Sequence, residues 1–322
     1  MVFEGAGTRN RINEITAQAK NPLFVCEARN NMLAAGAVCF NAFTPNPQYE
    51  EVLNGIALYE REKCDFLISI GGGSAIDVAK GINLVQRENP RCPHLAIPTT
   101  AGTGSEATHF AVLYKDGKKI SLAHPALVPE HVILDPDFLT TLPEYHKKST
   151  LLDALCQSIE SLWAKGATEE SRNFARESAD IIYKAMDKYL DGGEGMSMMR
   201  GAYLSGKAIN ISKTTAAHAM SYGLSQQYNI AHGHAVALCL PHIWQHLLKK
   251  GTVPAVPNSN ALEAFKQVLK KMALPFSVAF TQQTIELLTA DVNEERLSNH
   301  PVTITKNEMA EMYRQILEGV TI

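Results

Sequence analysis

The feature that most restricts how this chain folds is a run of three glycines between an apolar segment and a helical pattern. The segment reads DFLISIGGGSAIDVAKGI, and Gly71, Gly72, Gly73 and Ser74 form what we call the glycine turn. Glycines let the backbone bend sharply and bring its amides against a ligand, and the positive end of the following helix points to the same place. The pattern predicts a phosphate-binding loop. Because it matches neither GxGxxG nor a Walker motif, an ordinary tight turn remains the alternative.

Short apolar runs alternate with amphipathic helical patterns in the first part of the chain. The predicted strands are Leu23–Cys26, Val38–Phe40, Phe66–Ile70, Leu95–Ile97 and Val132–Leu134, and the predicted helices between them are Tyr49–Lys63 and Ala75–Val85. Such alternation is typical of parallel βαβ units with helices on both faces of the sheet. From Pro143 onward the patterns are almost all helical, as in 149–163, 170–190 and 196–211. The sequence therefore predicts an α/β nucleotide-binding domain with a parallel sheet in residues 1–142 and an all-α domain in residues 143–322.

A second polar loop follows the next predicted strand after the glycine turn. In IPTTAGTGSEAT, hydroxyls come from Thr99, Thr100, Thr103 and Ser105, and we call residues 99–105 the threonine loop. In open α/β folds, loops that follow successive strands gather at the carboxyl edge of the sheet, where ligands bind. Two such loops in neighbouring units favour a dinucleotide over a single phosphate. A solvated surface loop is the alternative.

A carboxylate and several imidazoles occur in the helical part of the chain. Asp153 and Gln157 in STLLDALCQSIESLW are four residues apart and share one face of a predicted helix. Farther along, KTTAAHAMSYGLSQQYNIAHGHAVALCLP contains His218, His232 and His234. One carboxylate with two imidazoles suits a divalent transition metal that leaves positions open for a substrate, and such an ion polarises a carbonyl. By spacing alone, helix caps, salt bridges and backbone-bonded histidines explain the same residues.

Charge and cysteine usage argue against several classes of function. The chain has 30 Lys and Arg against 33 Asp and Glu, a formal net charge of -3, which gives no electrostatic reason to expect nucleic acid or a membrane surface as a partner. No apolar run approaches the roughly 20 residues that a membrane-spanning helix needs. The six cysteines form no Cys-x-x-Cys pair, which favours free thiols in a reducing compartment over a disulfide framework. We expect a cytoplasmic protein, with a homodimer as the default assembly.

Seven segments of the chain resemble the group III, or iron-containing, alcohol dehydrogenases, whose fold is dehydroquinate-synthase-like. In order they are FTPNPQYEEV, ISIGGGSAIDVAKG, IPTTAGTGSEAT, LVPEHVILDPDFLTTLP, LDALCQSIES, HAMSYGLSQQYNIAHGHAVALCLP and LSNHPVTIT, from about residue 43 to 305. The resemblance implies an NAD(P)-dependent oxidoreductase that acts on a CH–OH group. It also implies that the glycine turn holds the pyrophosphate of NAD(H) or NADP(H), and that the threonine loop lines the phosphate and nicotinamide end of the cofactor.

The resemblance further implies a ligand set for one divalent metal, iron or zinc. Asp153, His218 and His232 fall on three of the family's four ligand positions. Gln157 occupies the fourth, where the family has histidine, and a neutral amide oxygen is a weaker ligand than imidazole for first-row metals. Tyr222 replaces a further family histidine four residues after His218. We expect Gln157 to act as a weak fourth ligand or to bond to water at the metal.

Finer details resemble the phosphonoacetaldehyde reductase (2-hydroxyethylphosphonate dehydrogenase) branch of that family. They are SEATHFAVLY, SLAHPALVP, DALCQSIESLW and INISKTTAAHAMSY. The narrower resemblance implies reduction of phosphonoacetaldehyde to 2-hydroxyethylphosphonate. Two alternatives stay open. One is an enzyme of the same family that acts on an uncharged aliphatic alcohol or on maleylacetate, and the other is a metal-free cofactor-binding protein without catalysis, in which Gln157 cannot hold the metal.

A doubly charged phosphonate that leaves water needs cationic and hydroxyl partners. Lys213, five residues before His218, and its neighbour Thr214 are expected to face the cleft near the metal. His109 directly follows the threonine-loop segment, and His124 lies in SLAHPALVP, so we expect both near the substrate as well. The alternative is that Lys213 caps a helix and the two histidines bond to the backbone.

One acidic residue bears on the choice of cofactor. Glu27 ends the predicted strand Leu23–Cys26, where a carboxylate can accept hydrogen bonds from the adenosine ribose hydroxyls. A 2′-phosphate at that place would meet like charge, so the sequence predicts a preference for NADH over NADPH. An exposed carboxylate on a loop is the alternative.

Overall fold

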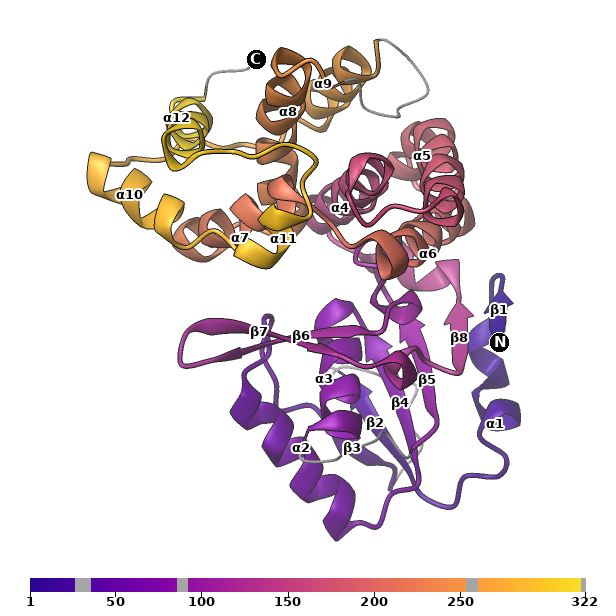
Figure 1. Ribbon diagram of the computed structural model, residues 1–322. Helices are drawn as coiled ribbons and strands as arrows, with labels where there is room; N and C mark the ends of the chain where they lie inside the picture. Colours follow the sequence, from indigo (N-terminus) through magenta and orange to yellow (C-terminus); the bar gives the residue numbers. More distant parts are fainter. Residues whose placement is uncertain (27–35, 86–91, 253–259, 320–322) are drawn as a thin grey trace.

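The structure is a computed structural model that describes residues 1–26, 36–85, 92–252 and 260–319. An α/β part occupies the lower half of Figure 1 and a helical part the upper half. The strands of the described chain are β1 Val2–Glu4, β2 Pro22–Cys26, β3 Val38–Phe40, β4 Phe66–Gly71, β5 His94–Pro98, β6 Phe110–Lys115, β7 Lys118–Ala123 and β8 His131–Leu134. Its α-helices are α1 Ile12–Ile15, α2 Tyr49–Arg61, α3 Gly73–Leu84, α4 Glu144–Trp163, α5 Glu169–Leu190, α6 Gly195–Ser212, α7 Ala216–Tyr228, α8 His232–Lys249, α9 Ala261–Met272, α10 Gln282–Ala290, α11 Glu294–Ser298 and α12 Lys306–Leu317. Short 3-10 helices are η1 Thr8–Arg11, η2 Ser105–Ala107, η3 Pro125–Leu127 and η4 Pro136–Thr141.

Six strands form one parallel sheet in the order β1-β8-β5-β4-β2-β3. The five strands predicted from the sequence are all in it, with ends that differ from the prediction by no more than one residue. The predicted helices between them are present as α2 and α3. The predicted fold class, a parallel α/β part followed by a helical part, is therefore confirmed.

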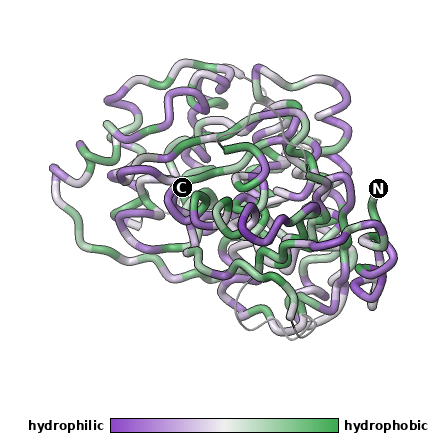
Figure 2. The backbone as a smooth tube through the Cα atoms, turned by 90° about the horizontal axis from the view of Figure 1, so that it is seen from below, coloured by the Kyte–Doolittle hydropathy of each residue, from purple (hydrophilic) through white to green (hydrophobic). Residues whose placement is uncertain are grey.

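Both faces of the sheet are covered, and each face has its own apolar core. Leu67 of β4 packs in a core with Val52 of α2 and Val78 of α3. Its neighbour Ile68 points to the other face and belongs to a core with Ile12 of α1. Burial on both sides explains why the strand before the glycine turn is a continuous apolar run. In Figure 2, hydrophobic segments lie mostly in the middle of the projection and hydrophilic segments mostly around its rim.

Two features of the α/β part were not predicted. The strand β1 extends the sheet beside β8, and β6 and β7 form a separate antiparallel hairpin. The hairpin turns at Asp116 and Gly117, with φ of 51° and 72°, and positive φ at both central residues matches the twist of the flanking strands. The hairpin extends toward α7 and α11 (Figure 1), and Lys119 of β7 lies against Tyr222 of α7. It therefore connects the α/β part to the helical part.

The helical part is organised around α4. Every residue of this helix from Leu151 to Trp163 is buried, as expected for a helix surrounded by others. The predicted helices 149–163, 170–190 and 196–211 correspond to α4, α5 and α6, although α4 begins five residues earlier, at Glu144. We retain the predicted domain boundary between residues 142 and 143 as a proposal. Within the described residues, no helix has the length and apolar character needed to cross a membrane.

Candidate active site

The glycine turn and the threonine loop lie side by side at the carboxyl edge of the sheet. β4 ends at Gly71 and its neighbour β5 at Pro98, and these two residues are partners in the parallel register. The amide of Thr99 donates a hydrogen bond to the carbonyl oxygen of Gly71 over 2.9 Å. Helix α3 begins at Gly73, so the unpaired amides of its first turn lie at the same edge. The two loops together form a polar surface suited to a pyrophosphate.

The glycine turn has no room for side chains. A Cβ on Gly73 would lie 2.9 Å from the hydroxyl oxygen of Thr103, and one on Gly71 would lie 2.6 Å from the Cβ of Ala75. Real Cβ atoms do not approach other atoms so closely. Glycine is therefore required here by the packing of the threonine loop against α3, in addition to any approach of a ligand to the backbone.

A buried lysine fixes the end of the threonine loop. Nζ of Lys80 donates to the carbonyl oxygens of Thr108 and Phe110, each over 2.8 Å, and to that of Ser105 over 2.5 Å. The hydroxyl of Ser105 in turn donates to the carboxylate of Asp77 over 2.6 Å. Ser105 was predicted to line the cofactor site, but its hydroxyl is used inside the protein. Of the predicted hydroxyl contacts to the cofactor, we therefore retain only those of the threonines.

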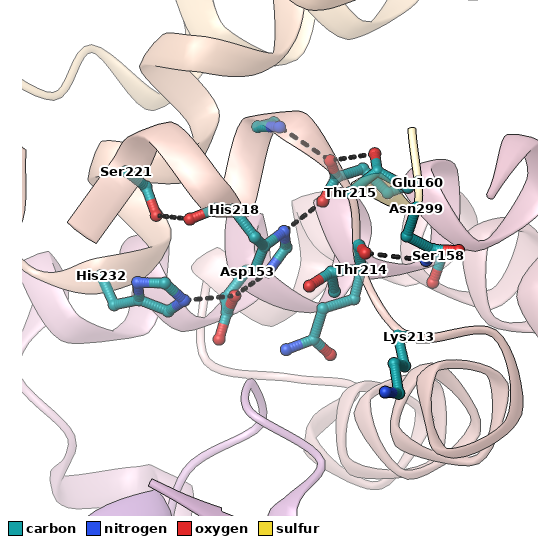
Figure 3. A network of polar contacts seen from close by, with 12 residues as sticks. Asp153, Ser158, Glu160, Lys213, Thr214, Thr215, His218, Ser221, His232 and Asn299 are labelled. Atoms are coloured by element: carbon teal, nitrogen blue, oxygen red, sulfur yellow. Dashed lines mark hydrogen bonds and ion pairs between the residues drawn. The ribbon is translucent and has the colours of Figure 1, made fainter. Parts of the chain in front are cut away.

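Asp153, His218 and His232 come together, and we call them the metal-binding group. One ligand atom of each lies within 4.8 Å of the others. Oδ1 of Asp153 is 3.4 Å from Nε2 of His218 and 3.9 Å from Nε2 of His232. The residues come from α4, α7 and the first position of α8 (Figure 3). The side chain of His232 is 35% exposed and the other two are 4% exposed, so the group is closed on one side and accessible on the other.

Two buried polar atoms of this group form no hydrogen bond within the part of the chain that the structure describes, and a metal ion could bind both of them. Oδ1 of Asp153 and Nε2 of His218 are buried and face each other over 3.4 Å, and neither forms a hydrogen bond among the described residues. Buried polar atoms left in that state cost free energy. Burial lowers the pKa of His232 to about 4, so its imidazole is neutral and keeps a lone pair for a ligand bond. The residues present therefore fit a divalent cation such as iron or zinc.

Glu160 orients one of the imidazoles. This fully buried carboxylate accepts a hydrogen bond from Nδ1 of His218, as well as from the hydroxyl of Thr215 over 2.5 Å and the amide of Ala217 over 2.8 Å. Because a carboxylate only accepts, Nδ1 of His218 carries a proton, and Nε2 faces Asp153. Figure 3 shows this chain of contacts from Glu160 through His218 to Asp153.

Replacing Glu160 by glutamine is expected to weaken metal binding by about 10- to 100-fold, the usual effect of removing a carboxylate behind a metal-bound histidine. The amide keeps the size of the side chain but can present a donor to Nδ1 of His218. Metal affinity is measured by competition with a chelator. Glu308→Gln is the matched control. Glu308 also pairs with a histidine, His246, with 3.2 Å between the two side chains, but neither residue belongs to the metal-binding group. An unchanged affinity in Glu160→Gln would contradict the role given to Glu160.

Gln157 is placed one turn after Asp153, but its amide already has partners. Its Nε2 donates to the carbonyl oxygen of Thr103 over 3.2 Å, and its Oε1 accepts from the hydroxyl of Ser205 over 2.9 Å. Gln157 thus joins the threonine loop to the helix that carries Asp153. Because an amide oxygen has a second lone pair, ligation by Gln157 stays a prediction.

Tyr222 and His234 lie in the same sequence segment as the two histidine ligands but do not belong to the metal-binding group. The ring of Tyr222 stacks on the imidazole of His232, with 5.4 Å between centroids and 3° between planes. His234 does not join the metal-binding group, because its Nδ1 lies 3.3 Å from the hydroxyl of Tyr145. The substitution of tyrosine for a family histidine therefore puts an aromatic ring beside the accessible ligand His232.

Lys213 and Thr214 follow the last turn of α6. Lys213 is the C-terminal cap residue of that helix, with φ of 57°, and its ammonium forms an ion pair with Glu295 over 2.6 Å. The side chain of Thr214 is buried, and its carbonyl oxygen accepts from Asn299 over 3.0 Å. The positive charge of Lys213 is thus already paired. The alternative that Lys213 caps a helix agrees with its position at the end of α6.

The two histidines proposed for the substrate are bonded to the protein. Nδ1 of His109 lies 2.5 Å from Oδ1 of Asn210, and Nδ1 of His124 accepts from the amide of Ala126 over 3.2 Å. His124 therefore follows the alternative of a backbone bond, whereas His109 contacts a side chain of α6. Glu27, proposed to bind the adenosine ribose, lies outside the described residues.

Three residues near the site were not foreseen from the sequence. Glu160 had a signal, because it follows Asp153 by seven residues and so lies two turns on along the same helical face. Lys119 lies with its ammonium 3.3 Å from the ring centroid of Tyr222. Arg296 lies on α11 with its guanidinium 5.5 Å from the ring centroid of Phe110. Lys119 and Arg296 had no signal in the sequence, since the tertiary fold alone brings them to the site.

Comparison with known proteins bears on both parts of the chain. The family model described as iron-containing alcohol dehydrogenase matches residues 1–136. A second model, described as the C-terminal part of the Fe-containing alcohol dehydrogenase family, matches residues 147–292. Together they cover the sheet, the glycine turn and the metal-binding group.

Individual relatives agree with the family models. An NAD-dependent methanol dehydrogenase of Bacillus methanolicus is 28% identical over 90% of this chain and 88% of its own length. A phosphonoacetaldehyde reductase of Streptomyces viridochromogenes is 31% identical, over 57% of this chain and 53% of its own length. The crystal structure of an iron-containing alcohol dehydrogenase from Thermotoga maritima has a TM-score of 0.87 and 25% identity, and the match covers 98% of this chain and 97% of that one.

Proposed function

Because the chain belongs to the iron-containing alcohol dehydrogenase family, we propose that it reduces phosphonoacetaldehyde to 2-hydroxyethylphosphonate with NADH as the hydride donor. At the level of the family, it is an NAD(P)-dependent oxidoreductase that acts on a CH–OH group and binds NAD(H) and a divalent metal. What we propose beyond that level is the substrate and the choice of cofactor.

The observation that carries this function is the direct packing of the threonine loop on helix α4. A Cβ on Gly102 would lie 2.6 Å from the Cβ of Thr150, and Gln157 bonds to the carbonyl of Thr103. The same helix carries Asp153. A cofactor held along the threonine loop therefore ends beside the metal-binding group. Placing a hydride donor next to a group that binds a carbonyl oxygen is what interconversion of an aldehyde and an alcohol requires.

Each part of the chain has a task in this reaction. A divalent cation held by the metal-binding group would supply Lewis-acid polarisation of the substrate carbonyl. The glycine turn binds the pyrophosphate, and the threonine loop orients the nicotinamide end. Glu160 keeps His218 in the tautomer whose Nε2 faces the site. No side-chain nucleophile is needed, because hydride transfer forms no covalent bond to the protein.

The choice of substrate is supported by sequence similarity to a phosphonoacetaldehyde reductase, which covers 57% of this chain. The cationic side chains near the metal-binding group, Lys119 and Arg296, also favour a substrate with an acidic group over a simple aliphatic aldehyde. Maleylacetate, which is acidic as well, remains a competing substrate within the same family.

The test is to follow NADH absorbance with the metal-loaded enzyme and three substrates. We expect kcat/KM for phosphonoacetaldehyde to exceed that for propionaldehyde by about a hundredfold or more, because sites built for polar groups reject analogues that lack them. A higher efficiency with propionaldehyde or maleylacetate would leave the family assignment intact and refute this substrate. Binding of NADH without turnover of any of the three would favour a cofactor-binding protein without catalysis.

We further expect NADH to be used at least about tenfold more efficiently than NADPH, since a 2′-phosphate beside Glu27 brings like charges together and such contacts cost several kcal/mol. Replacing Glu27 by serine should remove most of that discrimination and also lower kcat/KM with NADH, because the hydrogen bonds to the ribose hydroxyls are weakened. Both values come from steady-state kinetics with each cofactor. An NADPH preference in the unmodified enzyme would refute the role given to Glu27.

A further inference from the structure

We propose that Lys119 and Arg296 bind the acidic head group of the substrate and so make the enzyme selective for a charged aldehyde over an uncharged one. This inference rests on the proposed function and assigns its specificity to two residues. They come from parts of the chain that are far apart in sequence, the β6–β7 hairpin and α11.

Lys119 is separated from the metal-binding group by a single aromatic ring. Its ammonium lies 3.3 Å from the ring centroid of Tyr222, and that ring is stacked in parallel on His232 at 5.4 Å. His232 is the most exposed of the three proposed ligands, and Lys119 lies on the side of the group that contains His232. A substrate whose carbonyl is bound at the metal-binding group would therefore have this cation one aromatic ring away.

Arg296 is held in place from two directions. Its amide donates to the side chain of Asn293, the N-terminal cap of α11, over 2.9 Å, and the amide of Asn293 donates to the carbonyl oxygen of Ala219 in α7 over 3.5 Å. Its guanidinium lies 5.5 Å from the ring centroid of Phe110 on β6. Arg296 is thus fixed between the helix that carries His218 and Tyr222 and the hairpin that carries Lys119.

Lys119 bonds to the hydroxyl of Tyr222, and neither Lys119 nor Arg296 is paired with a carboxylate among the described residues. Both side chains are partly buried. The nearby carboxylate, Glu295, is already paired with Lys213. The pKa of Glu295 is lowered first by its bond to Lys213, and the charges of Arg296 and Lys119 add to this effect. Partly buried cations without a carboxylate partner are unfavourable, so an anion that enters the site gains free energy from both.

A doubly charged phosphonate matches this pair of side chains. The planar guanidinium of Arg296 can form two parallel hydrogen bonds to its oxygens, and the ammonium of Lys119 supplies a compact point charge. A pyrophosphate of the cofactor is the competing anion. The glycine turn offers it the amides at the start of α3, whereas Lys119 and Arg296 are grouped around Tyr222 and Phe110.

The variants Lys119→Met and Arg296→Leu test the assignment, because they should impair the reduction of phosphonoacetaldehyde but not that of propionaldehyde. Each should raise KM for phosphonoacetaldehyde by about 10- to 100-fold, the range expected for one lost hydrogen bond to a charged group. For propionaldehyde, kcat/KM should stay within about threefold, and KM for NADH should not change. Arg296→Lys should recover part of the loss because it restores the charge without the planar fork.

Lys115→Met is the matched control, because Lys115 lies on the same hairpin with its ammonium 4.7 Å from the ring centroid of Tyr49. It should leave both substrates unaffected. Equal losses for charged and uncharged aldehydes in Lys119→Met and Arg296→Leu would show a structural role and overturn the inference. A rise in KM for NADH without a rise for phosphonoacetaldehyde would assign the two cations to the cofactor and also overturn it.

Calorimetric titration with 2-hydroxyethylphosphonate keeps the inference testable if turnover fails. The unmodified protein should bind it in the presence of the metal and NAD⁺, and each variant should weaken binding tenfold or more. Absence of binding by the unmodified protein would refute the inference. Binding without turnover of any aldehyde would refute the proposed function while leaving the head-group site in place.

Discussion

An alanine at position 232 is expected to remove the metal and to lower kcat/KM for aldehyde reduction by about a thousandfold or more. His232 supplies one of the three proposed ligands in the described part of the chain, and its Nε2 lies 3.9 Å from Oδ1 of Asp153. Lewis-acid stabilisation of developing charge is worth several kcal/mol, and each 1.36 kcal/mol changes the rate tenfold. Metal content and steady-state kinetics of the purified variant give the result.

The matched control is His234→Asn, two residues farther along α8. The imidazole of His234 contacts Tyr145 and lies outside the metal-binding group, so this variant should keep its metal and most of its activity. Folding of both variants is checked by their unfolding transitions. Full activity in the His232→Ala variant would refute its assignment as a ligand.

Replacing Gly233 by alanine is also expected to weaken metal binding, in this case because the added side chain does not fit between α8 and α4. A Cβ on Gly233 would lie 2.0 Å from the carbonyl oxygen of Ser149 and 2.8 Å from the Cβ of Asp153. The first turn of α8 would then have to move away from α4, which separates His232 from Asp153. We expect the free energy of unfolding to fall by about 2–3 kcal/mol, as for other overpacked cores, and metal affinity to fall with it.

Urea unfolding and chelator competition measure the two effects of Gly233→Ala. Gly193→Ala provides the comparison, because a Cβ there has its nearest neighbour, the carbonyl oxygen of Lys188, at 3.3 Å and lies far from the metal-binding group in sequence. It should change stability little and metal affinity not at all. If Gly233→Ala kept the metal affinity of the unmodified protein, the close contact between α8 and α4 would not be what positions the ligands.

The fold was predictable where periodicity and turn chemistry agree. The apolar strand, the glycine turn and the helix after it are found as β4 and α3 because glycine punctuates the change from strand to helix. The hairpin of β6 and β7 was missed although Asp116 and Gly117 are a known turn signal between two strands. The edge strand β1 has only three residues, and its pairing with β8 depends on contacts distant in sequence.

The candidate site was predictable in its ligands and less so in its surroundings. Spacing alone left Asp153, His218 and His232 open, and the family resemblance singled them out. Glu160 could have been found from its place on the same helical face as Asp153. The pairing of Lys213 with Glu295 could not have been found from the sequence, because a local pattern does not show which charges meet across the fold.

The most direct test of the central claim is activity as a function of bound metal. The purified enzyme is stripped with a chelator, its retained fold is checked, and Zn²⁺ or Fe²⁺ is added back in known ratios while NADH-dependent reduction of phosphonoacetaldehyde is followed. We expect activity to be lost on stripping and to return until about one ion is bound per chain, as for a single site with three protein ligands. Full activity in the folded, metal-free enzyme would contradict that claim.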